Sequence, residues 1–344
     1  MDAMHIPAPP IAGLAFRAVR LDDAAAMARI ANRCNEADGL DERLSPREVA
    51  GWLLKGTPNY DPTLDLLMAA VDDQPVAFTW LNWVITSEGI REFRVGGWVD
   101  PGWVRRGIGG ALLNWTERRA ADLAREQNGS EPVVLGTWAG EKRVAKRIMI
   151  ERAGYQPVRW FFEMIRAPLD EIELPPMPDG LEVQPMTPEH YRAVWDADVE
   201  AFRDHWGGFD DSDEAYRNFL EDPNFDPDLF VVAWDGDRVA GAVMNAISVD
   251  ENQAMRRQRG WLESVFVRRP WRRRGLAAAL VARSLVVLRT AGMSEAMLGV
   301  DADNPSGALH LYEKAGFVVH HRGVAYHKPL DLEGRQGEAM AGGN

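Results

Sequence analysis

The sequence predicts an α/β protein built from two tandem domains, each a mixed, twisted sheet flanked by helices. With 344 residues the chain is long enough for about two domains. Apolar runs that alternate like strands are interleaved with segments at helical spacing. Landmarks of the first half recur in the second, since Gly180 follows Gly13 by 167 positions and Gly275 follows Gly107 by 168. A period this long indicates a duplicated domain rather than a solenoid.

Each element expected in the first copy has a local reason. An alternating strand at 13–19 precedes a helix that Asp22 or Asp23 can cap. Gly154 marks the end of the last helix. Between them we expect a helix at 46–54, a hairpin that turns at 72–75, a strand at 93–99, a helix opening at 104–113, a strand at 133–137 and a helix at 142–152, and a strand at 160–165 closes the copy.

The second copy repeats this order. Its hairpin turns at 235–237, and an apolar strand at 262–267 leads into a basic turn that contains Gly275. The following segment has helical spacing until Gly292 stops it. A further strand at 298–302 and a helix that ends before Gly316 complete the copy.

A stiff, proline-rich stretch between the copies sets the predicted domain boundaries. The segment at 169–179 is the expected linker. The N-terminal domain is predicted over 13–168 and the C-terminal domain over 180–331. Residues 1–12 are expected to form a flexible arm, and 332–344 a disordered tail because they are polar and rich in glycine.

Composition narrows the classes of function. The formal net charge is −13, which argues against nucleic acid as a partner. No apolar run of about 18 residues is present, so we expect no membrane span. The first residues lack the basic start and apolar core of a signal peptide. Cys34 is the single cysteine, which rules out an intrachain disulfide. These features predict a cytoplasmic protein.

The strongest chemical signal is the basic turn of the second copy. A helix that starts directly after a strand presents free N–H groups and the positive end of its dipole, which suits a phosphate. Gly275 has no Cβ, so a phosphate can approach the backbone closely. The turn contains Arg272, Arg273, Arg274, Gly275, Leu276 and Ala277. The three arginines could also form a nucleic-acid patch, but the overall acidity favours a small phosphorylated ligand. A P-loop is excluded because no Gly-Lys-Ser/Thr follows.

The spacing Arg272-x-x-Gly275-x-Ala277 resembles the pyrophosphate-binding signature of the GCN5-related N-acetyltransferases, the GNAT superfamily. Residues 304–317 resemble the second motif of that family, with Asn304, Tyr312 and Gly316-Phe317 in place. The resemblance covers nearly the whole chain as two GNAT domains in tandem, a layout similar to that of mycothiol synthases. It implies acetyl-CoA as acyl donor and direct attack of an amine on the thioester. The sequence has no cysteine pair and no His-x-x-x-His, so we expect no metal site.

The resemblance also implies roles for particular residues. The main chain of Val265, Phe266 and Val267 would face the pantetheine and the thioester carbonyl. Backbone N–H groups of 273–277, with Arg272, would hold the pyrophosphate. Asn304 would lie near the pantetheine, although an asparagine before Pro305 is also a sufficient helix cap by itself.

Tyr312 is the candidate general acid that would protonate the departing thiolate. The alternative is a packed tyrosine on an amphipathic helix. The candidate base is less clear, because Trp261 stands where many GNAT proteins have a glutamate. Glu263 lies two residues further on the same face and could relay the amine proton, or could be a solvated strand residue. His205, in an acceptor-side loop with Asp204, is the alternative base.

The two copies are chemically unequal. Val104 stands at the position of Arg272, Lys142 at that of Asn304 and Ile150 at that of Tyr312. The N-terminal domain is therefore predicted to be catalytically degenerate. Its turn keeps part of the phosphate signature, so it is a possible second cofactor site that comprises Arg105, Arg106, Gly107 and Gly109.

The sequence thus predicts an acetyl-CoA-dependent N-acetyltransferase that acts on a primary amine of a small molecule or peptide. One alternative is acetylation of a cysteinyl amine, as by mycothiol synthases. Another is a non-catalytic, tandem acyl-CoA-binding module. We expect no nucleic-acid or membrane partner, and a monomer or homodimer.

Overall fold

The computed structural model describes residues 6–127, 129–203, 205–303, 307–330 and 332. These residues form two compact units. Unit 1 comprises the chain up to Val158 together with the segment from Ala325 onward. Unit 2 comprises Arg159–Val324. Most of the predicted arm is described, whereas the predicted tail at 332–344 lies almost entirely outside the described residues.

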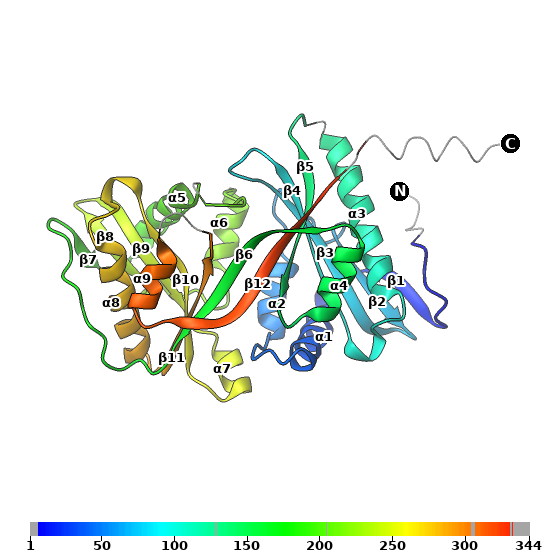
Figure 1. Ribbon diagram of the computed structural model, residues 1–344, viewed down its shortest axis with the longest axis horizontal. Helices are drawn as coiled ribbons and strands as arrows, with labels where there is room; N and C mark the ends of the chain where they lie inside the picture. The colour runs from blue at the N-terminus through cyan, green and yellow to red at the C-terminus, as the bar shows by residue number, and fades with distance from the viewer. Residues whose placement is uncertain (1–5, 128, 204, 304–306, 331, 333–344) are drawn as a thin grey trace. The chain divides into compact units, whose positions relative to one another are not determined.

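Unit 1 is a mixed sheet with helices (Figure 1). Its strands lie in the order β1-β2-β3-β4-β5-β12. The pairs from β1 to β4 are antiparallel, and β4 and β5 are parallel. The elements are β1 (Leu14–Ala18), α1 (Ala24–Ala37), α2 (Pro46–Leu53), β2 (Leu66–Val71), β3 (Gln74–Ile85), β4 (Arg91–Val99), α3 (Ile108–Gln127), β5 (Val133–Gly140), α4 (Val144–Arg152) and the end of β12 (Val318–Pro329).

Unit 2 has the same plan, and its strands lie in the order β12-β6-β11-β10-β9-β8-β7. Strands β10 and β11 are parallel, and β11 is antiparallel to β6. The elements are β6 (Gln156–Arg166), β7 (Glu182–Gln184), α5 (Tyr191–Phe202), α6 (Asp213–Leu220), β8 (Val231–Asp235), β9 (Arg238–Ala246), α7 (Val249–Met255), β10 (Arg259–Val267), α8 (Leu276–Thr290), β11 (Glu295–Asp301), α9 (Ala308–Lys314) and the start of β12. The predicted fold class, a mixed sheet with helices in each half, is confirmed.

The closing strands are distributed differently from the sequence repeat. β6 follows α4 in the chain, yet from Arg159 onward it belongs to unit 2, where it pairs with β11. The end of β12 belongs to unit 1, where Leu330 N donates to Val133 O. Each sequence repeat therefore differs from the corresponding compact unit in its closing strand. Most of β6, from the first repeat, lies in unit 2, and the end of β12, from the second repeat, lies in unit 1.

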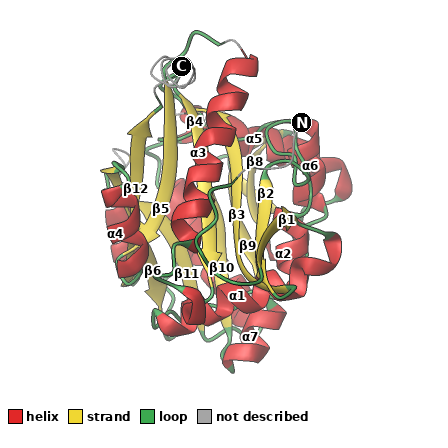
Figure 2. Ribbon diagram, turned by 90° about the vertical axis from the view of Figure 1, so that its right-hand side faces the viewer, coloured by secondary structure: helices red, strands yellow, loops and turns green. Residues whose placement is uncertain are grey.

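Both faces of each sheet are covered. On β2, Leu66 and Met68 pack in a cluster with α1, whereas Leu67 and Ala69 pack in a cluster with α3. Alternate side chains of one strand thus reach opposite faces, which explains why β2 is an uninterrupted apolar run. Figure 2 shows α3 lying across the strands of unit 1. In unit 2, α5 and α8 cover the two faces in the same way.

None of the helices in the described part of the chain combines the length and the apolar character needed to cross a membrane.

Candidate functional site

Two neighbouring strands of unit 2 part in the middle of the sheet. β10 pairs with β11 only over Arg259–Leu262, against Glu295–Leu298. Beyond this point β10 continues to Val267 with β9 on its other edge, and no described strand pairs with the edge that faces β11. The main-chain groups of Val265–Val267 on that edge are therefore free of sheet partners. An exposed edge of this kind can bind an extended ligand through backbone hydrogen bonds.

The turn between β10 and α8 has a defined backbone. Arg272 is extended, whereas Arg273 and Gly275 have positive φ angles of 61° and 85°. The first N–H groups of α8 have no partners inside the helix, so they are available to an anion. No atom lies within 4 Å of the place where a Cβ on Gly275 would stand. The turn is thus open at the residue where the sequence predicts a phosphate.

Two arginines of this turn form hydrogen bonds that hold its position, in addition to supplying positive charge. Arg272 Nε donates to Val267 O at 2.8 Å, and the guanidinium nitrogen Nη2 of Arg274 donates to Asp179 O at 2.9 Å. Trp271 is buried and its Nε1 donates to Asp235 at 3.0 Å, which anchors the start of the turn. Because Arg272 joins the turn to the end of β10, the anion-binding backbone and the free strand edge are held together.

Tyr312 lies on α9 and is 5 % exposed. Its ring packs edge-on against Phe317, with the centroids 6.1 Å apart. Tyr312 belongs to the same core cluster as Leu276 of α8, and Val265 and Val267 pack against that cluster. Burial raises the pKa of Tyr312 to about 12, so the phenol stays protonated at neutral pH. Asn304, the other predicted residue of this motif, lies outside the described residues.

Free strand edge, open helix N-terminus and buried phenol occur together within residues 191–317, which match the model of the acetyltransferase (GNAT) family. Over these residues the chain is similar to the GNAT acetyltransferases. This similarity supports transfer of an acetyl group to an amine as the activity.

Comparisons over the whole chain agree with a tandem GNAT layout. The mycothiol acetyltransferase of Clavibacter michiganensis is 29 % identical over 331 residues, which cover 90 % of this chain and 95 % of the relative. A GCN5-related N-acetyltransferase from Sphaerobacter thermophilus superposes with a TM-score of 0.66 at 27 % identity, covering 92 % and 96 % of the two chains. A tandem GNAT protein from the clavulanic acid biosynthesis pathway has the same fold, with a TM-score of 0.67, 17 % identity and coverage of 92 % and 99 %.

Glu263 occupies an unusual place on β10 of the GNAT unit. Leu262 pairs with Asn245 and Ser264 with Met244, so Glu263 is the extra residue of a β-bulge. Its side chain reaches solvent, yet surrounding protein atoms desolvate the carboxyl, and Asp222 and Glu251 add negative charge. Together these raise the pKa of Glu263 to about 7, with desolvation as the larger cause. A carboxyl with this pKa accepts protons efficiently near neutral pH.

The histidines of unit 2 have other surroundings. The ring of His205, the alternative base, stacks on Phe202 with centroids 4.3 Å apart, and its neighbour Asp204 lies outside the described residues. His310 is exposed on α9, with Nδ1 3.7 Å from a carboxylate oxygen of Glu313.

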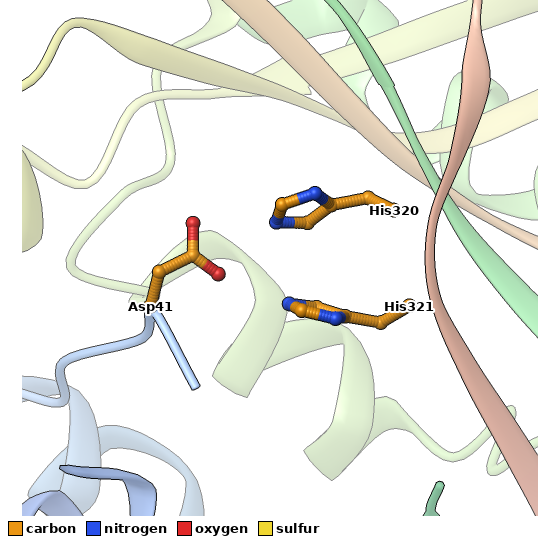
Figure 3. Close-up of side chains that lie close together, drawn as sticks. All are labelled: Asp41, His320 and His321. Atoms are coloured by element: carbon orange, nitrogen blue, oxygen red, sulfur yellow. The ribbon is translucent and has the colours of Figure 1, made fainter. Parts of the chain in front are cut away.

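His320 and His321 lie side by side on β12, with ring centroids 4.0 Å apart (Figure 3). Asp41, also drawn in Figure 3, belongs to unit 1.

Unit 1 repeats the backbone of the turn with different surroundings. Arg105 and Gly107 have positive φ angles of 59° and 90°, close to those of Arg273 and Gly275. A Cβ on Gly107, however, would lie 3.0 Å from Pro9. The remaining predicted residues are Arg106, which lies over the Trp103 ring at 4.7 Å, and Gly109, whose missing Cβ would lie 3.2 Å from the Met149 sulfur.

The position of Tyr312 in unit 1 is taken by Ile150, which is 1 % exposed and carries no proton to donate. Strand β4 diverges from β5 after Arg94, as β10 does from β11 after Leu262. In contrast, β4 pairs with β3 in one continuous register from Ala77 to Ile85, without a bulge. Unit 1 thus keeps the fold of the site but lacks the tyrosine and the bulge that carries Glu263.

Sequence reasoning missed Asp198, a buried residue of α5 that accepts a hydrogen bond from Ser264. Its signal in the sequence was an acidic residue on the apolar face of a helix, between Ala197 and Val199. Such a residue is almost never fully buried without a partner.

Proposed function

We propose that unit 2 transfers the acetyl group of acetyl-CoA to a primary amine of a small molecule or peptide, with Glu263 as base and Tyr312 as acid. The observation that carries this proposal is the free edge of β10 next to the open turn at Gly275, with the buried phenol of Tyr312 in the same core cluster as the start of α8. Two ionisable groups of this unit suit opposite tasks. Glu263 has a pKa of about 7 and can accept a proton, whereas Tyr312 has a pKa of about 12 and holds one.

The acyl donor fits the open turn and the free strand edge. The pyrophosphate of acetyl-CoA would bind the N–H groups at the start of α8, with Gly275 allowing close approach. The pantetheine arm would lie along Val265–Val267, where backbone N–H groups could polarise the thioester carbonyl. Phe266 contributes main chain only, because its side chain packs in the α5 cluster.

The reaction then proceeds by direct attack. Glu263 takes a proton from the ammonium form of the acceptor, directly or through one water. The amine nitrogen forms a bond to the carbonyl carbon, and the carbon–sulfur bond breaks. The thiolate leaves while the Tyr312 hydroxyl donates to it, and the remaining amine proton passes to solvent. Because an ordinary thiol has a pKa of about 8.5, complete transfer from Tyr312 to a free thiolate is uphill. Tyr312 therefore acts mainly while charge develops on sulfur.

A cysteinyl amine is the acceptor that the comparison favours. The relative from Clavibacter michiganensis, which matches nearly the whole chain, is a mycothiol acetyltransferase. We propose an acceptor of that chemical class for this chain, with unit 1 as a catalytically silent partner. A cytoplasmic location and a monomeric or homodimeric state remain predictions from the sequence.

The test is a panel of amines assayed with acetyl-CoA by release of free thiol. The panel contains cysteinyl amides, amino sugars and lysyl peptides, and each acceptor is corrected for its own thiol. Turnover that disappears in Tyr312→Phe is expected, with a preference for cysteinyl amines. Binding of acetyl-CoA without turnover on any amine would instead identify a non-catalytic acyl-CoA-binding module.

A further inference from the structure

The bulge at Glu263 reverses the faces of β10. Leu262 packs in the core cluster with α8, whereas Phe266 packs in the cluster with α5. In a regular strand, residues four apart face the same side. Here they face opposite sides, because the extra residue between Leu262 and Ser264 shifts the alternation by one. After the bulge, Val265 and Val267 turn to the α8 side. The bulge therefore decides which way Glu263 and its neighbours point.

A buried pair holds the bulge from the side of α5. Ser264 Oγ donates to Asp198 Oδ1 at 2.6 Å, and the two residues are 8 % and 4 % exposed. Burial raises the pKa of Asp198 to about 6, although the hydrogen bond from Ser264 opposes that effect. Two residues further along α5, Glu200 accepts a hydrogen bond from Arg268 Nε at 3.0 Å. Helix α5 is thus hydrogen-bonded to the residue that follows the bulge and to the residue that follows the end of β10.

Unit 1 provides an internal comparison. At the offset that relates Gly275 to Gly107, Ser264 corresponds to Gly96. At the offset that relates Gly180 to Gly13, Asp198 corresponds to Ala31. The space beside Gly96 is filled by Trp80, since a Cβ there would lie 2.3 Å from its ring. The hydroxyl, the carboxylate and the bulge are absent from this unit together.

We infer that Asp198 is a positioning residue for acetyl transfer, because its hydrogen bond to Ser264 fixes the bulge that presents Glu263 to the acceptor amine. The inference rests on the proposed role of Glu263 as base. Asp198 touches neither donor nor acceptor. It acts by keeping β10 in the bulged register, so that the Glu263 carboxyl stays in its desolvated surroundings.

The charged groups around Glu263 come from two other segments. Asp222 follows α6, and Glu251 lies on α7, where Arg257 pairs with it at 2.9 Å. Releasing the bulge should move the Glu263 carboxyl away from these charged groups and from the protein atoms that desolvate it. Its pKa should then fall toward the ordinary value of about 4.3, which gives a readout that a general loss of stability does not produce.

Three variants of α5 separate release of the bulge from a general loss of stability. Asp198→Ala removes the acceptor, Asp198→Asn keeps an oxygen that can accept from Ser264, and Val194→Ala opens a cavity in the same α5 cluster without touching the pair. Each is measured in the full chain by carbon-13 NMR titration of the glutamate carboxyls, with the Glu263 signal assigned through Glu263→Gln. The acetyl-CoA Kd and turnover with the best amine of the panel are measured alongside.

Asp198→Ala should lower the pKa of Glu263 by about one unit or more and reduce kcat at least about tenfold. Asp198→Asn should restore the wild-type pKa of Glu263 and the wild-type kcat, and Val194→Ala should leave the pKa of Glu263 unchanged. If Asp198→Ala does not fold, Ser264→Ala carries the same prediction.

An unchanged Glu263 pKa in Asp198→Ala and Ser264→Ala would overturn the inference, as would an Asn variant that behaves like Ala. Wild-type protein without turnover on any amine would defeat the proposed function instead. The NMR titration would still decide whether Asp198 holds the bulge.

Discussion

Pro9 lies directly against Gly107, so the space outside the phosphate-type turn of unit 1 is occupied by the chain itself. A Cβ on Gly107 would come within 3.0 Å of Pro9, whereas at Gly275 no described atom beyond the adjoining chain lies within 4 Å of the same place. Ile6 from the same segment is buried in the cluster that contains Ile108, the first residue of α3. The two turns share a backbone conformation and differ in what lies next to them.

This difference predicts one acetyl-CoA site per chain. Gly275→Val should weaken binding by about 100-fold, since it disturbs two or more charge-assisted hydrogen bonds of about 1.5 kcal/mol each. Gly107→Val is the matched control, because it introduces a β-branched residue at a similar positive φ of 90°. It should lower the melting temperature without changing the affinity. Calorimetric titration gives both stoichiometry and Kd, and two sites in the wild type would contradict the prediction.

Replacing Tyr312 by Phe should lower kcat by about 100-fold or more while leaving the acetyl-CoA Kd nearly unchanged. The ring packing on Phe317 is retained, so stability should change little. Tyr155→Phe in unit 1 is the control, since Tyr155 is also a buried tyrosine next to the last helix of its repeat. Steady-state kinetics of both variants check the role. Equal kcat values for the two would remove Tyr312 from the mechanism.

The activity should rise with pH through about 7. Below that value the Glu263 carboxyl is protonated and cannot accept the amine proton, and above it the carboxylate is available. The ionisation appears in kcat/KM, which reports the free enzyme. Glu263→Gln should lower kcat/KM and remove this ionisation between pH 5.5 and 8, values chosen to bracket about 7. If the variant keeps the wild-type profile, the base is another group, and His205→Gln is the next variant to measure.

Asp198 should make unit 2 less stable as the pH rises from about 4 to about 6. Its pKa is about 6 in the folded protein and 3.8 unperturbed, so the native state binds the proton more tightly. The stabilisation is complete below about pH 4, and up to about 3 kcal/mol is lost above pH 6. Urea unfolding of wild type and Asp198→Asn at pH 4 and pH 7 checks this, because the difference isolates the one carboxyl. The Asn variant should gain relative stability at the higher pH.

Several features of the candidate site can be predicted from the sequence because the signals for them are local. Gly275 needs a positive φ, and a glycine followed by an apolar helical segment reveals that need without any tertiary contact. The chemical difference between Tyr312 and Ile150 is equally visible in the chain. The fold class followed from the alternation of strands and helices within each repeat, and the structure confirms it.

Other features depend on residues far apart in the chain. The bulge at Glu263 is a register shift between β10 and β9, and Asp198 holds it from a helix 66 positions away from Ser264. The contact of Pro9 with Gly107 and the pairing of β6 with β11 are also long-range. Hydrophobic periodicity specifies which face of a strand is buried but not which strand or helix covers it.

The sequence by itself therefore determined the duplicated α/β plan, the glycine turn at Gly275 and the copy that retains Tyr312. Only the tertiary structure decided where Glu263 points, how its pKa is set and which segment lies against the turn of unit 1. The physical reason is that backbone preference and residue chemistry depend only on a residue and its neighbours in the sequence. Register, desolvation and the choice of packing partner exist only after the chain has folded.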